Sequence, residues 1–385
     1  MSRHSLLGDD IELISGQHVE AAELNSEHAG TPYLTGPTDF ENGKPRAERF
    51  TSAGRVFCKG GDILLVVKGS GTGAVFRADK RYAIGRQLMA IRPRTWSGDF
   101  VHQVMLAYTR RYESQATGLI PGISRDVVLD TPFPPLPLTQ QERVAQMLMA
   151  WDSVIGNQQS LIKTKLIRLQ SLRQQLVLGS KRFPSLNRTK WRRVQLNEVL
   201  KHIFRPVNWS PRDLYRLISI RRRCGGLFRR EDLLGADYKT TDLHEIRTGD
   251  FLVSKRQVVH GAWAMVTKEF SGCHVSKEYS ILVNKAPDVL HMPFFDWLSH
   301  EQRMWHLAFL ASDGVHREKL IFDSKDFLRH YIELPPTIQE QERIVEVLDA
   351  CDQEIRLLEA QLEALKLQKR GLMQKLLSGD IRVKV

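Results

Sequence analysis

The chain has 385 residues, which is more than one hydrophobic core usually serves, so two or more domains are expected. Hydrophobic residues make up 42% of it, which indicates globular domains. The 56 Lys and Arg residues exceed the 44 Asp and Glu residues, which gives a formal net charge of +12. Such a surface attracts nucleic acid or an anionic membrane, and a basic soluble protein without a polyanionic partner is the alternative.

The cysteines and the N-terminal residues exclude several classes of protein. Cys58, Cys224, Cys273 and Cys351 show no CxxC spacing, so neither a disulfide framework nor a zinc site is expected. The opening "MSRHSLLGDDIELISG" lacks the apolar core of a signal peptide, and no later run approaches the roughly 18 apolar residues of a membrane span. We therefore expect a soluble, cytoplasmic protein.

The first predicted domain covers residues 1–135 and consists mainly of short strands. "TPYLT" at 31–35 and "YAIGRQLMAI" at 82–91 have the composition of strands, and a Gly-Asp turn at 61–62 enters the strand "ILLVV". The polar loop "VKGSGTGA" at 67–74 follows. It is either an ordinary hairpin turn or flexible backbone that approaches a polyanion closely, and it is no P-loop because no GK[ST] follows.

A long helix is predicted over residues 136–180. Its apolar residues recur every three or four positions from Val144 to Leu176, which is typical of a coiled-coil seam. Two seam positions, Gln158 and Lys165, are polar and would fix the pairing register. Thr139 with Glu142 has the spacing of a capping box at the start, and Gly179 suits the left-handed position after the end.

The second predicted domain covers residues 181–333, and a second long helix lies within residues 334–385. The domain contains the strand-like segments "DLYRLISI" and "CHVSKEYSILV", an arginine-rich stretch at 221–230, and a Gly-Asp turn at 249–250. The helix has an apolar seam from Ile344 to Leu376, a polar seam residue at Lys369, and a capping box of Thr337 with Glu340; Gly379 follows its last apolar turn.

The second half of the chain repeats the first. "QQERVAQMLMAWD" and "QEQERIVEVLDACD" share Gln, Glu, Arg, Leu, Ala and Asp at positions 200 residues apart, and the two Gly-Asp turns lie 188 residues apart. Neither long helix can bury its apolar seam alone. We therefore predict an α+β fold in which two domains alternate with two long helices that pair as an antiparallel coiled coil, with approximate two-fold symmetry; packing of each helix on its own domain is the alternative.

This arrangement resembles the DNA-specificity subunit of type I restriction-modification systems. "PPLPLTQQERVAQMLMAWD" and "LPPTIQEQERIVEVLDACD" resemble the proline-led helix starts of that family, and "GDILLV", "GDFLVS", "HVSKEYSILV" and "WRRVQLNEVL" resemble its target recognition domains. The first domain departs from the pattern because it lacks a W-x-x-V-x-L lead-in. The resemblance implies an asymmetric bipartite DNA target, with one half-site for each domain and unread bases between.

Cations, hydroxyls and amides that could contact phosphates or base edges cluster in the predicted loops. The DNA-binding candidates are Lys68, Ser70, Thr72, Arg77, Arg86, Arg221, Arg222, Arg223, Arg229, Arg230, Lys255, Arg256, Gln257, Ser276 and Lys277. For the arginines, a solvated or nonspecific face is the alternative.

The resemblance also implies protein partners. These are a methyltransferase subunit, usually in two copies, and a DNA-translocating endonuclease subunit. S-adenosylmethionine, ATP and Mg would be bound by those subunits. Glu142, Arg143, Glu342 and Arg343 are the candidate docking residues on the helices, and helix capping or pairing within the helix is the alternative role for them.

We expect no catalytic residues and no metal site, because the sequence has no methyl-donor motif, P-loop or nuclease motif, and His244, His260 and His274 lack further ligands at zinc spacing. Two other functions stay open. A DNA-targeting module of another phage-defence system would be distinguished by its neighbouring genes. An architectural coiled-coil protein would bind DNA without the specificity ratio of roughly 10³ or more that recognition requires.

Overall fold

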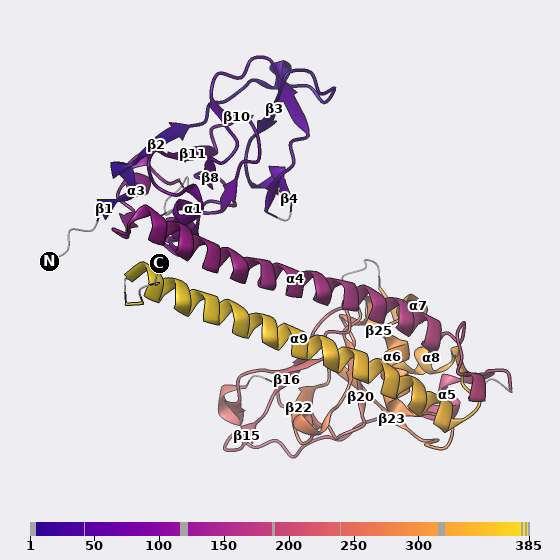
Figure 1. Cartoon of the computed structure of the whole chain (residues 1–385). Helices are drawn as coiled ribbons and strands as arrows, with labels where there is room; N and C mark the ends of the chain where they lie inside the picture. Colours follow the sequence, from indigo (N-terminus) through magenta and orange to yellow (C-terminus); the bar gives the residue numbers. More distant parts are fainter. Residues whose placement is uncertain are drawn as a thin grey trace. The chain divides into compact units, whose positions relative to one another are not determined.

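The computed structural model describes residues 5–41, 43–115, 122–186, 189–238, 240–314, 320–378, 380–381 and 383. It divides into two compact units, Met1–Ser160 with Glu359–Val385, and Leu161–Leu358. Each unit contains one globular domain and one part of each of the two long helices, α4 (Leu138–Val177) and α9 (Ile338–Ser378) (Figure 1). We call the residues before α4 the first domain and the residues between α4 and α9 the second domain.

The first domain is mostly β-structure. Its elements are β1 (Ser5–Leu6), β2 (Ile11–Ser15), β3 (Thr31–Leu34), β4 (Phe40–Glu41), β5 (Lys44–Pro45), β6 (Arg49–Thr51), β7 (Phe57–Cys58), β8 (Ile63–Val66), β9 (Val75–Arg77), β10 (Tyr82–Ile84), β11 (Leu88–Pro93), α1 (Gly98–Ala107), α2 (Thr109–Gln115), α3 (Arg125–Leu129) and β12 (Pro132–Phe133). The strands predicted at 31–35 and 82–91 are confirmed as β3, β10 and β11.

The second domain has a similar succession of elements. They are β13 (Arg192–Gln195), α5 (Leu196–Val199), β14 (Leu200–Ile203), β15 (Leu214–Tyr215), β16 (Ile218–Ile220), β17 (Leu227–Arg229), β18 (Leu233–Leu234), β19 (Leu243–Glu245), β20 (Phe251–Ser254), β21 (Trp263–Met265), β22 (His274–Ser276), β23 (Tyr279–Asn284), α6 (Met292–Ser299), α7 (Gln302–Leu310), β24 (Ser312–Asp313), β25 (Ile321–Phe322), α8 (Ser324–Leu328) and β26 (Tyr331–Leu334).

Both domains contain a four-stranded antiparallel sheet with corresponding strand order. The order is β2-β11-β8-β9 in the first domain and β14-β23-β20-β21 in the second. In each sheet the strand after the Gly-Asp turn, β8 or β20, is central. The duplication read from the sequence is therefore confirmed in the connectivity of the sheets.

The strand that leads into each domain is also duplicated. β1 pairs with β12 in the first domain as β13 pairs with β26 in the second. The amide of Leu7 donates to Thr131 O, and the amide of Leu196 donates to His330 O in the same way. The first domain thus retains a lead-in strand although the W-x-x-V-x-L pattern is absent from its sequence.

The two domains differ beyond these shared sheets. The first has a second four-stranded sheet, β6-β3-β10-β7, in which β3 and β10 are parallel. The second has the strand pairs β15-β18, β16-β17 and β19-β22 instead. Among the strand pairs of the described residues, β3 with β10 is parallel and the others are antiparallel.

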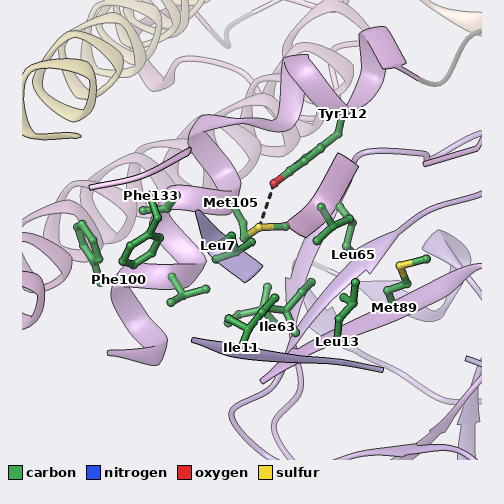
Figure 2. Packing of buried hydrophobic residues seen from close by; sticks show 14 of the residues in the cluster. Leu7, Ile11, Leu13, Ile63, Leu65, Met89, Phe100, Met105, Tyr112 and Phe133 are labelled. Carbon is green, nitrogen blue, oxygen red and sulfur yellow. Dashed lines mark hydrogen bonds between the residues drawn. The ribbon is translucent and has the colours of Figure 1, made fainter. Parts of the chain in front are cut away.

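The core of the first unit lies between the sheet and the helices. Ile11, Ile63 and Met89 from the sheet pack against Phe100 and Met105 of α1, as Figure 2 shows. The same cluster contains Val144 and Leu148 of α4 and Leu376 of α9. The helices therefore bury part of their apolar seam against the domain, as the alternative interpretation of the sequence proposed.

The long helices also pair with each other, in an antiparallel sense, within each unit. In the first unit Lys369 Nζ donates to Asp152 Oδ1 at 2.6 Å, and Gln158 Nε2 donates to Gln361 Oε1 at 3.2 Å. In the second unit Lys165 Nζ donates to Glu354 Oε1 at 2.6 Å. Since all three polar seam residues have a partner on the facing helix, their predicted role in fixing the register is supported.

The start of α4 corrects one prediction. The helix begins at Leu138, and the amide of Gln141 donates to Pro137 O, so Thr139 lies inside the first turn and is not the cap. At α9 the predicted cap is confirmed, because the amide of Glu340 donates to Thr337 Oγ1 at 3.3 Å. Gly179 adopts φ +71° after α4, as predicted, whereas Gly379 lies outside the described residues.

The Glu340 carboxylate differs from the capping-box prediction in its partners. It accepts two hydrogen bonds from the guanidinium of Arg182, both at 2.7 Å, and one from Trp191 Nε1 at 3.4 Å. A buried carboxylate gains more from a bidentate arginine than from an exposed cap amide. The start of α9 is therefore joined to the segment that follows α4 and to the lead-in of the second domain.

Candidate nucleic-acid interface

The glycine-rich loop of the first domain is a hairpin connection. It joins β8 to β9, and Gly69 and Gly73 adopt φ of +94° and +96°, a region that suits glycine. Lys68 and Ser70 are exposed, and Thr72 Oγ1 donates to Gly69 O at 2.6 Å. The hairpin interpretation of this loop is confirmed, and its exposed Lys68 and Ser70 remain available to a ligand.

Two further candidates of the first domain have different surroundings. The guanidinium of Arg77 forms an ion pair with Asp99, the acidic residue in the first turn of α1. Arg86 is exposed between β10 and β11. Because Arg77 already has a carboxylate partner, Arg86 is the better placed of the two to neutralise a phosphate.

The arginine-rich stretch of the second domain is the β16–β17 hairpin. Arg223 and Cys224 adopt φ of +58° and +53°, which is uncommon for residues with a Cβ. Their amides donate to His260 O and Gly261 O, both at 2.8 Å, so the backbone of a neighbouring loop holds the turn. Arg222 and Arg223 are exposed on this fixed turn.

The other arginines of the hairpin flank that turn. Arg221 Nη1 donates to Leu227 O at 3.2 Å, and its guanidinium lies 4.7 Å from the centre of the Phe228 ring. Arg229 and Arg230 are exposed at the end of β17. The hairpin thus presents several guanidinium groups on a backbone of fixed shape.

The last candidates of the second domain come together from two loops. Lys255 Nζ donates to Lys277 O at 2.7 Å, and Arg256 Nε donates to Glu278 at 2.6 Å, so the residues after β20 contact the β22–β23 turn. Ser276 Oγ accepts from the Glu278 amide at 3.4 Å within that turn. Lys277 Nζ lies 3.1 Å from Asp242. The structure therefore brings Lys255, Arg256, Ser276 and Lys277 into one patch.

Gln257 is oriented differently from its neighbours. Its Oε1 atom is buried and has no hydrogen-bond partner within the described part of the chain. Its backbone amide and carbonyl bond to Ser254 and Ala262, which shapes the short connection to β21. Gln257 therefore serves at least to form this loop, and its contact with DNA remains a proposal.

The Gly-Asp turns have a structural role that the sequence did not indicate. Asp62 accepts two hydrogen bonds from Arg92, at 2.9 and 2.8 Å, and Asp250 accepts a bidentate pair from Arg205. Both carboxylates are almost fully buried. Arg92 lies on β11, whereas Arg205 follows β14, so the two arginines do not occupy corresponding positions. The repeated Asp was the only part of this arrangement visible in the sequence.

Gln141 and Gln341 anchor each domain to its helix. Gln141 Oε1 accepts from the amide of Ser97 at 3.0 Å, and Gln341 Oε1 accepts from the amide of His291 at 2.8 Å. Their Nε2 atoms donate to Leu136 O and Val289 O. The repeated glutamine was visible in the sequence, but its buried position was not.

The four candidate docking residues lie exposed at the starts of the helices. These are Glu142, Arg143, Glu342 and Arg343. Arg343 Nη1 donates to Glu346 of the same helix at 2.7 Å, which agrees with the alternative of pairing within the helix. Ile167 and Leu367, 200 positions apart, are also exposed, by 61% and 64%.

The described residues hold no group of three or more His, Cys, Asp or Glu side chains placed to bind a metal. All four cysteines are free thiols, and burial raises the pKa of Cys58 and of Cys224 to about 11. Burial also lowers the pKa of His244 and His274 below the usual value. No helix in the described residues has the length and apolar character that a membrane span requires.

The fold just described, two β-rich domains alternating with two long helices, occurs in known structures. The crystal structure of the type I restriction-modification system S subunit from M. genitalium superposes with a TM-score of 0.60 at 14% identity, over 97% of this chain and 95% of that one. A chain from a structural study of the assembly and conformational transition of the type I R-M system superposes with a TM-score of 0.61 at 18% identity, over 98% of both.

No protein-family model matches the sequence, and no curated protein does. The likeness to solved structures extends over nearly the whole chain, at identities that establish the fold. The chain therefore has the fold of type I restriction-modification S subunits, as the resemblance in its sequence predicted.

Proposed function

We propose that this chain is the DNA-specificity subunit of a type I restriction-modification complex. The observation that carries the proposal is the duplicated framework, in which two domains with the same sheet order each anchor to an antiparallel helix pair through an equivalent glutamine. This framework is combined with the fold of known S subunits and a net charge of +12. A framework that repeats while its loops differ suits one molecule that reads two different half-sites.

Each domain would read one half-site of a bipartite asymmetric target, with the helices setting the distance between them. The exposed loop cations would neutralise phosphates, and the hydroxyl, amide and guanidinium groups beside them would read base edges. In the first domain these are Lys68, Ser70, Thr72, Arg77 and Arg86. In the second they are the Arg221–Arg230 hairpin and the patch of Lys255, Arg256, Gln257, Ser276 and Lys277.

Catalysis would belong to partners. A methyltransferase subunit would bind S-adenosylmethionine, and a restriction subunit would bind ATP and Mg, so this chain would supply positioning and no chemistry. Two methyltransferase copies would dock on the helices, at Glu142 and Arg143 and at Glu342 and Arg343, with Ile167 and Leu367 as equivalent apolar contacts. The complex would act in the cytoplasm.

The test is a methylome. The chain is expressed with its methyltransferase subunit in a host that lacks DNA methylation, and modified bases are mapped across the genome. We expect one split, asymmetric motif with modification on both strands. An assembled complex with an active methyltransferase that modifies no defined motif would contradict the proposal and favour an architectural DNA-binding protein or a targeting module of another defence system.

A further inference from the structure

The second domain exposes a phenylalanine directly after β14. Phe204 is 68% exposed, which is the highest value among the exposed large hydrophobic residues of the described chain. A single exposed apolar side chain is common on protein surfaces and is not a site by itself. Phe204 differs from such residues because two imidazole rings contact it.

Two imidazoles flank the Phe204 ring. The His202 ring centre lies 4.5 Å from that of Phe204 in a T-shaped arrangement, and the His244 ring centre lies at 5.9 Å. Aromatic pairs favour such edge-to-face and offset arrangements, and the His244 ring is tilted by 50° to that of Phe204. Phe204 thus contacts the two imidazoles at its sides while most of it faces solvent, which leaves apolar ring surface available to a planar ligand.

The imidazoles are suited to a neutral, polar contact. Burial, and then the charge of Lys255, lowers the pKa of His202, and burial lowers the pKa of His244, so the surroundings favour the neutral form of both rings. A neutral imidazole has one donor and one acceptor nitrogen. The Nδ1 atom of His244 is buried and has no hydrogen-bond partner in the described residues.

The surroundings of this aromatic cluster favour a polyanion. The charges of Lys255 and Lys325 both lower the pKa of His202. Lys255 is also hydrogen-bonded to the backbone of Lys277. The charge of Asp323 raises the pKa of His202, and the charge of Asp242 raises the pKa of His244, so both aspartates oppose the effect of the lysines. Lysines around an aromatic surface are typical of sites where protein contacts both the phosphates and the bases of nucleic acid.

The corresponding position in the first domain has different chemistry. Ile63 and Phe251, the first residues after the two Gly-Asp turns, pair with Ile91 and Leu282. Ile91 pairs in turn with Leu13, and Leu282 pairs with His202. Two residues further along the chain in each domain, Ser15 therefore occupies the position of Phe204. Ser15 Oγ accepts a hydrogen bond from Arg125 Nη1 at 2.8 Å. One framework position thus carries an aryl ring in one domain and a hydroxyl with a guanidinium in the other.

We propose that Phe204 is a specificity-determining residue that contacts a base of the second half-site through its ring. The inference rests on the proposed function. An aromatic ring at a groove can pack on a thymine methyl group or enter a base step, whereas an arginine at the same place favours guanine. His202 and His244 are positioning residues that hold the ring.

The experiment compares the methylomes of complexes that contain the wild-type chain, Phe204→Ala, Phe204→Tyr and Phe309→Ala. Phe309, in α7, is 45% exposed and is the matched control. In Phe204→Ala we expect discrimination at one base pair of one half-site to fall about ten-fold, with the other half-site unchanged. Phe204→Tyr keeps the ring and should keep the motif, as should Phe309→Ala.

Equilibrium binding separates base recognition from general affinity. Phe204→Ala should weaken binding to a duplex that contains the motif identified by the methylome about ten-fold. It should leave unchanged both the salt dependence of binding and the affinity for an unrelated duplex. Equal losses on both duplexes, or no loss on either, would overturn the assignment of Phe204 while the wild-type motif still supports the specificity-subunit function. A wild-type complex without any motif would overturn both.

Discussion

The loop that follows the central strand is glycine-rich in the first domain, at residues 67–74, whereas the loop of the same length in the second domain, at residues 255–262, is hydrogen-bonded to a second, arginine-rich hairpin. The strands on either side occupy the same sheet positions in both domains. Gly73 and Gly261 lie at corresponding places, and Gly261 O accepts a hydrogen bond from the amide of Cys224 in the arginine-rich hairpin of the second domain. The comparison separates a shared framework from the loops that would carry recognition.

The framework should fail in both domains when its buried carboxylate is removed. Asp62→Ala and Asp250→Ala each leave an arginine without its bidentate partner, and we expect each to lower the free energy of unfolding by about 3 to 5 kcal/mol. Denaturant unfolding measures this. Asp242→Ala breaks an exposed pair with Lys277 and should cost less than about 1 kcal/mol, so similar losses in all three variants would contradict a framework role.

The arginine hairpin should affect DNA binding in the second domain only. Replacing Arg221, Arg222 and Arg223 together by Ala should lower affinity about 100-fold at physiological salt and flatten the log-log salt dependence by up to about 2.7, since each phosphate contact contributes about 0.9. Binding titrations at several salt concentrations measure both. An unchanged slope would show that the hairpin lies away from DNA.

His102 and Asp296 each lie five residues after the amide that the repeated glutamine binds, and they should respond to pH in opposite directions. Burial, and then the Asp349 charge, raises the pKa of Asp296 from 3.8 to about 6, so the folded state binds more protons and stability falls as pH rises through that range. Burial, and then the Arg77 charge, lowers the pKa of His102 from 6.5 to about 4, so its contribution to stability falls as pH drops through that range.

Two variants test this contrast. Asp296→Asn keeps an acceptor for the Met265 amide and should raise stability near pH 7, on the order of 2 kcal/mol, with no gain at pH 4. His102→Asn should reduce the loss of stability between pH 6.5 and pH 4. Thermal unfolding across pH 4 to 7.5 is the measurement, and parallel pH profiles for wild type and both variants would refute the assignment.

The glutamine anchors should show the smallest and most symmetrical effect. Gln141→Ala and Gln341→Ala each leave a partly buried amide and a partly buried carbonyl without the glutamine that bonds them, so each should cost about 1 to 2 kcal/mol. Gln140→Ala, one residue from the first anchor, is the control. A loss of unfolding free energy in only one of the two variants would show that the two glutamines do not contribute equally to stability.

Sequence periodicity predicted the long helices and their seam because heptad spacing is a local signal. The repeat between the two halves of the sequence located the Gly-Asp strands. Neither signal could identify Arg92 and Arg205 as partners of these aspartates, because Arg92 lies on β11 and Arg205 follows β14, at unrelated distances along the chain. Arg77 was predicted to be a DNA-binding cation because its ion-pair partner, Asp99, lies in a different segment of the chain.

Phe204 had no sequence signal at all. A single phenylalanine after a short strand is ordinary, and only the fold places His202 and His244 beside it. The cap of α4 was misplaced because Thr139 and Glu142 have capping-box spacing, although the helix already begins at Leu138; Pro137 stands where α9 has its cap Thr337. Local patterns therefore defined the framework, whereas the functional surface depended on contacts between distant segments.

The most direct test of one half-site for each domain is a domain replacement. Because the helix starts are equivalent, residues 190–337 can replace residues 1–137 ahead of Leu138. With assembly verified by co-purification with the methyltransferase subunit, the methylome of this variant should contain a symmetric motif made of the second half-site in both orientations. An asymmetric motif, or one that retains the first half-site, would contradict the division of recognition between the two domains.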